Sequence, residues 1–385
     1  MGKGNGNGNG NGNGNGNGNG NGNGNEVGTG ADNPSVFATG AGAGTGTGDA
    51  PGSKWTADLL ILDHLPKEFF QLGPQELHQL FPGPTLIRLL SSQRPWFFVS
   101  TLLHGNETTG LKALQQLLME YGSNLPCSLL LLIGNPAAAA QGLRSLPGQL
   151  DQNRIWADGA LLATSWAQAL LKEVLAHQPM AAIDIHNTTG RGEPYSVITH
   201  LNAEHMFLAR EFSSNVVHFR EPHTTLVNAL GEHIPSVVLE CGPSEGDEKR
   251  KDHLLHYLKA LFSRSNIGQT SLVEPGLHLF ESQARVFVGG RFAFGPQGSG
   301  GLSLDPDLDL NNFKLLAAGQ LWGTYESRKD FEFLVRDTQG QDVTAQYFDL
   351  SNGEIRVRKP FVPSLITTSV PAAQEDCLCY IMKRI

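Results

Sequence analysis

Two short segments of this chain hold the residue types of a hydrolytic zinc site. One is His104-Gly-Asn-Glu107 and the other is Asp184-Ile-His186. Two imidazoles and one carboxylate are the protein ligands of such sites, in which a fourth position stays open for water. We therefore predict that His104, Glu107 and His186 bind one Zn²⁺ ion per chain. Asp184 lies on the same strand face as His186, where it could orient a ligand imidazole or hold neighbouring polar groups.

Strands are expected to bring these two segments together. The apolar runs Trp96–Leu103 and Met180–Ile185 have the pattern of buried strands, and each stops where a candidate ligand begins. The carboxyl ends of parallel strands meet at one edge of a sheet, where open α/β sheets bind their ligands. A His-x-x-Glu segment alone is common by chance, but the second segment and its aspartate favour a metal site over two unrelated histidines.

A metal hydrolase also needs a base that takes a proton from water and returns it to the leaving nitrogen. Glu240 follows the apolar run Ser236–Leu239 and precedes Gly242-Pro243, which breaks regular structure. Its carboxylate should therefore emerge at the same sheet edge as the candidate ligands. We predict that Glu240 is the general base.

Two arginines are candidates for contacts with a substrate. Arg154 follows Asn153, and a guanidinium beside an amide is suited to gripping a carboxylate through two parallel hydrogen bonds. Arg144 lies in the preceding loop, where it could polarise the scissile carbonyl and stabilise the oxyanion. The alternative for both arginines is a solvated side chain or a pair with Asp151.

The order of apolar segments predicts an α/β fold, with a mixed, mostly parallel sheet flanked by helices. Strand-like and helix-like segments alternate from about Trp55 to Ser263, and the helix-like ones include Leu111–Leu118 and Leu161–Leu175. After Thr270 short strand-like runs alternate with turn residues, which indicates a smaller C-terminal β domain. We place the α/β domain at 54–268 and the β domain, which would cap the cleft, at 269–385.

Residues 1–53 are predicted to be a disordered tail, because Gly and Asn alternate from Gly4 to Asn25 and almost nothing apolar follows. A formal charge of −9 and a pI near 5.8 argue against a nucleic-acid partner. The sequence contains no run of about 20 apolar residues of the kind that spans a membrane. Four cysteines without zinc-knuckle spacing indicate reduced, buried thiols, so a cytoplasmic protein is expected, and a homo-oligomer is possible.

Taken in order, the motifs resemble those of the succinylglutamate desuccinylase/aspartoacylase family, within the zinc metallocarboxypeptidase superfamily. The resemblance runs from about residue 95 to 245 and rests on His104-Gly-Asn-Glu107, Asn135-Pro136, Asp151-Gln-Asn153-Arg154, Asp184-Ile-His186-Asn187-Thr188 and Glu240-Cys-Gly-Pro243. It implies a carboxypeptidase-like α/β fold, capped by a β domain, that hydrolyses amide bonds. It also implies the metal ligands His104, Glu107 and His186, the base Glu240, and a substrate-carboxylate site at Asn153 and Arg154.

The resemblance extends to further contacts with a substrate. Arg144 looks like the family arginine that polarises the carbonyl, although the loop after it is slightly longer here. Asn187 and Thr188 belong to the second metal motif and are predicted to bind substrate. Aspartoacylases have another arginine about ten residues before the catalytic glutamate, where this chain has Ala229-Leu230-Gly231. Arg191 could take over that contact, and Tyr195 could line the pocket or simply pack.

Three functions are compatible with these residues. The first is a zinc-dependent deacylase that cleaves the amide bond of N-acylated amino acids by attack of zinc-bound water. The second is a zinc carboxypeptidase acting on short or cell-wall peptides, since the same catalytic groups serve both reactions. The third is a zinc-binding scaffold without turnover, against which the presence of Glu240 argues because a scaffold needs no base.

Overall fold

The computed structural model describes residues 53–56, 58–92, 95–157, 165–244, 248–269, 275–296 and 301–385. The predicted tail therefore lies outside the described residues except for Ser53, and so do Leu161 and Leu162 of the second predicted helix. Among the helices of the described ranges, none combines the length and the apolar character needed to cross a bilayer.

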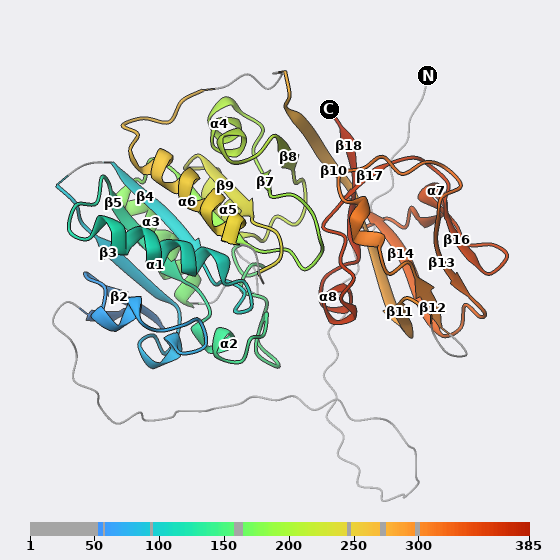
Figure 1. Cartoon of the computed structure of the whole chain (residues 1–385), viewed down its shortest axis with the longest axis horizontal. Helices are drawn as coiled ribbons and strands as arrows, with labels where there is room; N and C mark the ends of the chain where they lie inside the picture. The colour runs from blue at the N-terminus through green and yellow to red at the C-terminus, as the bar shows by residue number, and fades with distance from the viewer. Residues whose placement is uncertain are drawn as a thin grey trace, which may run out of the picture. The chain divides into compact units, whose positions relative to one another are not determined.

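The larger sheet has 13 strands, and Figure 1 shows most of them. Twelve form one path, in the order β1 (Ser53–Thr56), β2 (Leu59–Leu62), β3 (Thr85–Leu89), β5 (Ser128–Ile133), β4 (Trp96–Thr101), β6 (Ala182–His186), β9 (Ser236–Glu240), β7 (Tyr195–Ile198), β8 (Asn215–His218), β10 (His278–Gly290), β18 (Cys379–Arg384) and β17 (Val362–Ser364). β14 (Phe331–Asp337) pairs with β10 off this path.

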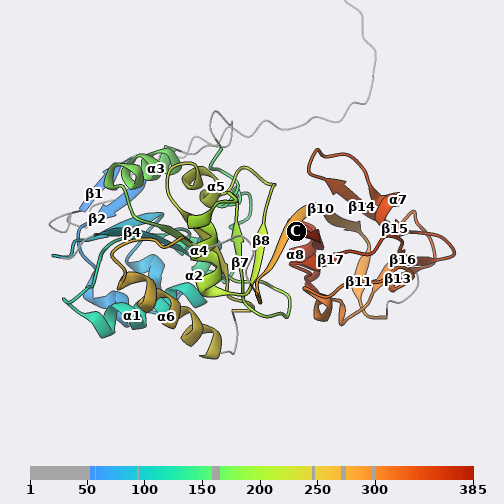
Figure 2. The same ribbon diagram turned by 90° about the horizontal axis from the view of Figure 1, so that it is seen from above.

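Helices cover both faces of this sheet because its strands are apolar on both sides. Phe97, Val99 and Leu131 pack in a core with α1 (Thr109–Tyr121), α4 (Ala203–Phe212) and α6 (Glu248–Phe262). Phe98 and Leu130 pack on the opposite side with α3 (Ser165–His177) and α5 (Leu226–Gly231). Figure 2 shows α1 and α6 on one side of the strands and α3 and α5 on the other.

A second sheet lies in the C-terminal part, in the order β11 (Phe292–Phe294), β12 (Leu302–Leu304), β13 (Leu321–Tyr325), β16 (Glu354–Val357) and β15 (Phe348–Asp349). Its core is aromatic, with the Trp322 ring 4.8 Å from that of Phe348. The remaining elements are short: α2 (Pro136–Ala140), α7 (Thr344–Tyr347), α8 (Val370–Glu375), η1 (Lys67–Phe70), η2 (Leu77–Gln79) and η3 (Leu308–Asn311).

The predicted fold class is confirmed, because a large mixed sheet flanked by helices precedes a C-terminal β region. One connection differs from the prediction. The sequence after Thr270 predicted only short strands, but β10 is a single strand of 13 residues that pairs in parallel with β8 and antiparallel with β14 and β18. The main sheet therefore continues past residue 268, and the division at that residue stays a prediction.

Candidate active site

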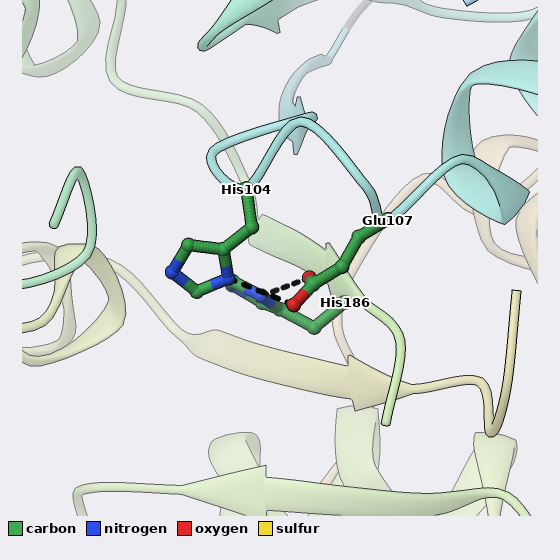
Figure 3. A group of neighbouring side chains, drawn as sticks. All are labelled: His104, Glu107 and His186. Atoms are coloured by element: carbon green, nitrogen blue, oxygen red, sulfur yellow. Dashed lines mark hydrogen bonds and ion pairs between the residues drawn. The ribbon is translucent and has the colours of Figure 1, made fainter. Parts of the chain in front are cut away.

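His104, Glu107 and His186 converge at the carboxyl ends of β4 and β6. One ligand atom from each of the three lies within 4.8 Å of the other two. The Nδ1 atom of His104 is 2.8 Å from Glu107 Oε1, and that of His186 is 2.7 Å from Glu107 Oε2. Figure 3 shows both rings directed at the carboxylate. The three side chains are buried, so this arrangement is held by the fold rather than by solvent.

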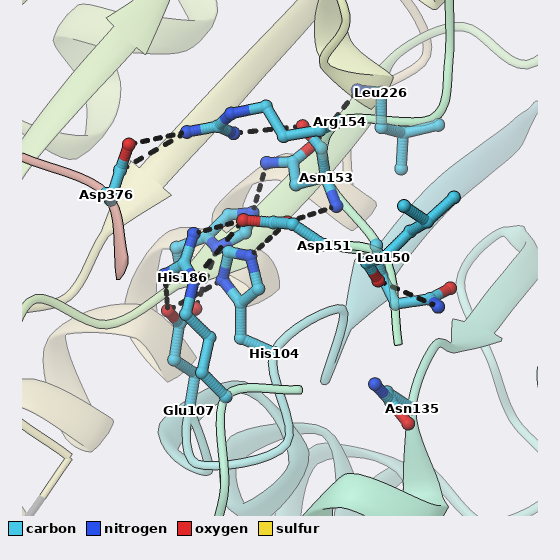
Figure 4. A network of polar contacts seen from close by, with 12 residues as sticks. His104, Glu107, Asn135, Leu150, Asp151, Asn153, Arg154, His186, Leu226 and Asp376 are labelled. Atoms are coloured by element: carbon cyan, nitrogen blue, oxygen red, sulfur yellow. Dashed lines mark hydrogen bonds and ion pairs between the residues drawn. The ribbon is translucent and has the colours of Figure 1, made fainter. Parts of the chain in front are cut away.

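An aspartate holds the far nitrogen of each ring. Asp151 Oδ1 lies 3.0 Å from His104 Nε2 (Figure 4), and Asp184 Oδ2 lies 2.8 Å from His186 Nε2. Such contacts fix which ring nitrogen faces the centre, as metal-binding histidines require. The contact of Asp184 was predicted from its strand position. The contact of Asp151 was not predicted, although its place in the motif with Asn153 was a usable signal.

The loop from His104 to Glu107 depends on a close approach of backbones. A Cβ atom on Gly105 would lie 2.2 Å from the backbone nitrogen of Ala139, so only glycine fits there. The Gly105 N–H donates to the Arg144 carbonyl at 3.0 Å. Substitution of this glycine would push the loop away from α2 and displace the neighbouring histidine.

Asn187 fixes Glu107 and the start of α1. Its backbone N–H donates to Glu107 Oε2 at 3.2 Å, and its side-chain oxygen accepts the backbone N–H of Thr109 at 3.2 Å. The side-chain nitrogen donates to Thr109 Oγ1 and to the Gly242 carbonyl. Thr108, the residue that precedes α1, makes no side-chain cap bond, so the asparagine supplies the acceptor for the first N–H of the helix.

Glu240 ends the strand next to the one that carries His186. Strands β6 and β9 are parallel, and His186 pairs in register with Glu240, so both side chains point to the same face. Glu240 is 9% exposed, and burial raises its pKa to about 8 against the lowering effect of His186. Among the described residues, none hydrogen-bonds to its carboxylate, which leaves it open to a ligand in the cavity it lines.

Arg144, Asn153 and Arg154 stand around this group. The Arg144 guanidinium donates to Asp151 Oδ2 at 2.8 Å and has one nitrogen 3.7 Å from Glu107 Oε1. The Asn153 side-chain nitrogen lies 3.2 Å from His186 Nε2, while its oxygen accepts the Leu226 N–H. Arg154 donates to the Asn153 carbonyl at 2.9 Å. All three line one cavity with His104, Glu107, His186 and Glu240.

Residues 95–257 match the profile of the succinylglutamate desuccinylase/aspartoacylase catalytic domain. This part of the chain belongs to that family. The matched range contains the two metal motifs, the loop with the arginines and Glu240, so the resemblance drawn from the motifs is confirmed. No protein of curated function matches the sequence significantly.

The fold is similar to that of a solved structure with the same family name, and two further structures match less closely. The succinylglutamate desuccinylase of Vibrio parahaemolyticus superimposes with a TM-score of 0.52 and 12% identity, over 78% of this chain and 86% of that chain. The succinylglutamate desuccinylase of Chromobacterium violaceum gives 0.49 and 19%, over 76% and 86%. Murine aminoacylase 3 gives 0.45 and 16%, over 77% and 97%. At 12% identity the likeness to the Vibrio parahaemolyticus protein concerns the fold alone.

Two cavities meet at Glu107 in this desuccinylase/aspartoacylase domain. The inner one, about 100 Å³, has an apolar wall formed by Val197, Phe219, Val238 and Leu365. The outer one, about 240 Å³, is lined by polar residues that include Asn106, Thr188, Thr189 and Ser244. Residues Arg144, Asn187, Asp376 and Tyr380 border both cavities, so the C-terminal part contributes directly to their walls.

The structure does not bring every predicted substrate residue to these cavities. The guanidinium of Arg191 is bonded to Asp309 and Asp307, and Arg191 is absent from the lining of both cavities. Tyr195 pairs in register with Glu240, but its ring packs 4.9 Å from Phe313 rather than lining either cavity. Thr188 does line the outer cavity, with its hydroxyl donating to the Gly190 carbonyl.

The pKa of Glu240 predicts how the stability of the metal-free protein depends on pH. The unfolded chain loses this proton near the ordinary pKa of 4.5, whereas the folded protein holds it until about pH 8. The contribution of Glu240 to stability is therefore lost as the pH rises through this window. Relative to the wild type, Glu240→Gln should gain about 3 kcal/mol of unfolding free energy between pH 5.5 and 8, at about 1.4 kcal/mol per pH unit. Urea unfolding at both pH values measures it, and an unchanged difference would refute the raised pKa.

Proposed function

We propose that this protein is a zinc-dependent hydrolase that cleaves the amide bond of N-acylated amino acids. The observation that carries the proposal is the convergence of two imidazoles and one carboxylate within 4.8 Å, beside a buried glutamate in a cavity that also holds arginines. Membership of the desuccinylase/aspartoacylase family supports the same reaction class. The substrate is a small molecule, and the four free, buried cysteines agree with the proposed cytoplasmic location.

The donor set fits zinc. Two neutral imidazoles and one carboxylate provide three ligands, and the aspartates behind the rings leave both Nδ1 atoms facing the centre. In the metal-free arrangement, Asp184 and Glu107 raise the pKa of His186 well above its usual value although burial opposes the charge. The carboxylates of Asp184 and Glu107 therefore favour a positive charge between the two imidazole rings. Zinc, when bound there, supplies a Lewis acid and lowers the pKa of the water in its open position.

Glu240 is the proposed general base. Its carboxylate lies at the same strand register as His186, so it stands beside the position that the ligand atoms surround. We propose that it takes the proton of the attacking water and later delivers that proton to the leaving amine nitrogen. Burial favours the protonated form of Glu240, which suits a group that must hold a proton between the two steps.

The arginines complete the proposed site. Arg144 keeps one guanidinium nitrogen near Glu107 and borders both cavities, a place from which it can stabilise the negative charge that develops on the carbonyl oxygen. Arg154 and Asn153 line the inner cavity, where we propose that they bind the carboxylate of the amino acid. The acyl group would then extend towards the outer cavity.

A carboxypeptidase acting on short peptides is the second candidate. The outer cavity favours it, because this space shares Thr188, Thr189 and Ser244 with a further surface hollow that reaches Lys112. A chain longer than a simple acyl group could lie along these polar residues. A zinc scaffold without turnover is the third candidate, and the buried Glu240 argues against it.

The purified protein loaded with zinc should be tested against matched N-acetyl, N-succinyl and dipeptide derivatives of the same amino acids. We expect release of free amino acid from the acyl derivatives, measured as new primary amine. Cleavage of the dipeptides alone would establish the carboxypeptidase instead. A protein that binds one zinc ion and hydrolyses none of the compounds would refute the enzyme proposal and favour the scaffold.

A further inference from the structure

Asp376, from the C-terminal part of the chain, forms an ion pair with Arg154, the arginine proposed to bind the substrate carboxylate. Asp376 follows α8 and lies 222 positions after Arg154 in the chain, yet its two carboxylate oxygens are 3.4 and 3.2 Å from Arg154 Nη2. Figure 4 shows the carboxylate facing the guanidinium, with Asn153 on the other side. Asp376 lines both the inner and the outer cavity, so this pair stands in the substrate space.

A second arginine holds the same carboxylate. Arg285, on β10, donates through Nη2 to Asp376 Oδ1. Its guanidinium also lies over the ring of Tyr380, which stacks on Phe219 of the inner cavity at 4.5 Å. Arg285 does not line either cavity, so Asp376 is shared between one arginine that faces the substrate space and one that lies behind it.

The charges of this cluster leave place for one more anion. Arg154 and Arg285 carry two positive charges and share the single negative charge of Asp376, whereas Arg144 is paired with Asp151 and Glu107. A ligand with a single carboxylate balances the cluster. A second carboxylate on the side chain would instead meet the apolar wall that contains Val197 and Val238, at a cost in desolvation.

We propose that Asp376 is an internal competitor for the substrate carboxylate on Arg154, and that the apolar wall of the inner cavity favours amino acids with one carboxylate and an apolar side chain. The proposal rests on the function proposed above for Arg154. When the substrate carboxylate binds Arg154, Asp376 moves off that arginine and keeps Arg285, so no charge is left unpaired. The energy of breaking one charge-assisted contact is then subtracted from the affinity of every carboxylate ligand.

The test compares N-acetyl-L-leucine with N-acetyl-L-leucinamide, which lacks only the carboxylate charge. Binding is measured by calorimetry on the full-length, zinc-loaded protein carrying Glu240→Gln, so that turnover cannot interfere. In that background, Asp376→Asn should tighten binding of the carboxylate ligand about tenfold and leave the amide ligand unchanged. Equal or weaker binding of the carboxylate ligand would overturn the proposal, and so would binding of neither ligand.

A second variant predicts the opposite sign. Arg285→Gln leaves Asp376 with Arg154 alone, so the carboxylate ligand should bind about tenfold more weakly while the amide ligand is again unaffected. The matched control is Asp309→Asn, which breaks the pair with Arg191 outside both cavities and should change neither affinity. The binding measurements do not depend on hydrolysis. The predicted changes in affinity can therefore be absent while the substrate panel shows turnover, and they can be present while the panel shows none. In an active protein, Asp376→Asn should lower KM for N-acetyl-L-leucine.

Discussion

Replacing Glu240 by glutamine should abolish hydrolysis while the protein still binds one zinc ion. Glutamine has nearly the same shape, and the backbone pairing of this position with His186 is unchanged. Its amide, however, cannot take a proton from water. General acid–base catalysis contributes about 10² to 10⁴-fold to enzymatic rates, so kcat should fall by about three orders of magnitude. Steady-state kinetics on an active N-acyl amino acid, with zinc content measured by atomic absorption, gives both results.

The controls separate a lost proton carrier from a damaged fold. Glu281→Gln changes a partly buried glutamate on β10 outside the two cavities and should leave kcat within twofold. Glu107→Gln should instead reduce the zinc content, since it weakens a proposed ligand. Retention of more than a tenth of the wild-type kcat in Glu240→Gln would exclude Glu240 as the general base.

Replacing His104 by alanine should remove zinc and activity together. The side chain is 3% exposed, and its loss takes away one of three proposed ligands and the contact with Asp151. Two remaining ligands do not make a closed zinc site, so the metal should be lost on dialysis and kcat should fall to background. Asp151→Asn tests the support of the ring and should weaken zinc binding about 10 to 100-fold.

His205→Ala is the matched control for this loss. His205 is also buried, at 2% exposed, but its ring contacts Asn202 at the start of α4 rather than Glu107. The variant should lose stability and keep its zinc. If His104→Ala retained a full equivalent of tightly bound zinc, the proposed ligand set would be wrong.

The part of the site that can be predicted from the sequence lies at strand ends. His104, His186 and Glu240 each follow an apolar run, and parallel strands of such runs must end at one edge of the sheet. The structure brings these three residues and Glu107 to one cavity for that reason. The local sequence pattern was sufficient to predict these positions, because each residue is placed by the strand that directly precedes it.

The remaining contacts depend on segments far along the chain. Asp376 reaches Arg154 only because α8 and β18 return to the cavity, and no periodicity near either residue indicates this. Arg191 looked available beside the second metal motif, but Asp309 of η3, 118 positions later, binds its guanidinium. Thr108 is of a residue type that often caps helices, yet Asn187, which follows β6, supplies the acceptor at the start of α1. Such competition between distant partners is decided by tertiary packing.

The parallel pairing of β8 with β10 limits how this protein can be divided. A fragment ending near residue 268 would keep β8 but lose β10, the strand that pairs with the backbone of β8 at Val216 and Val217. The bare edge would then be free to recruit strands from other molecules, which is a common route to insoluble aggregates. A shortened catalytic protein therefore has to retain the chain through β18, so the C-terminal residues are needed for solubility as well as for the walls of the cavity.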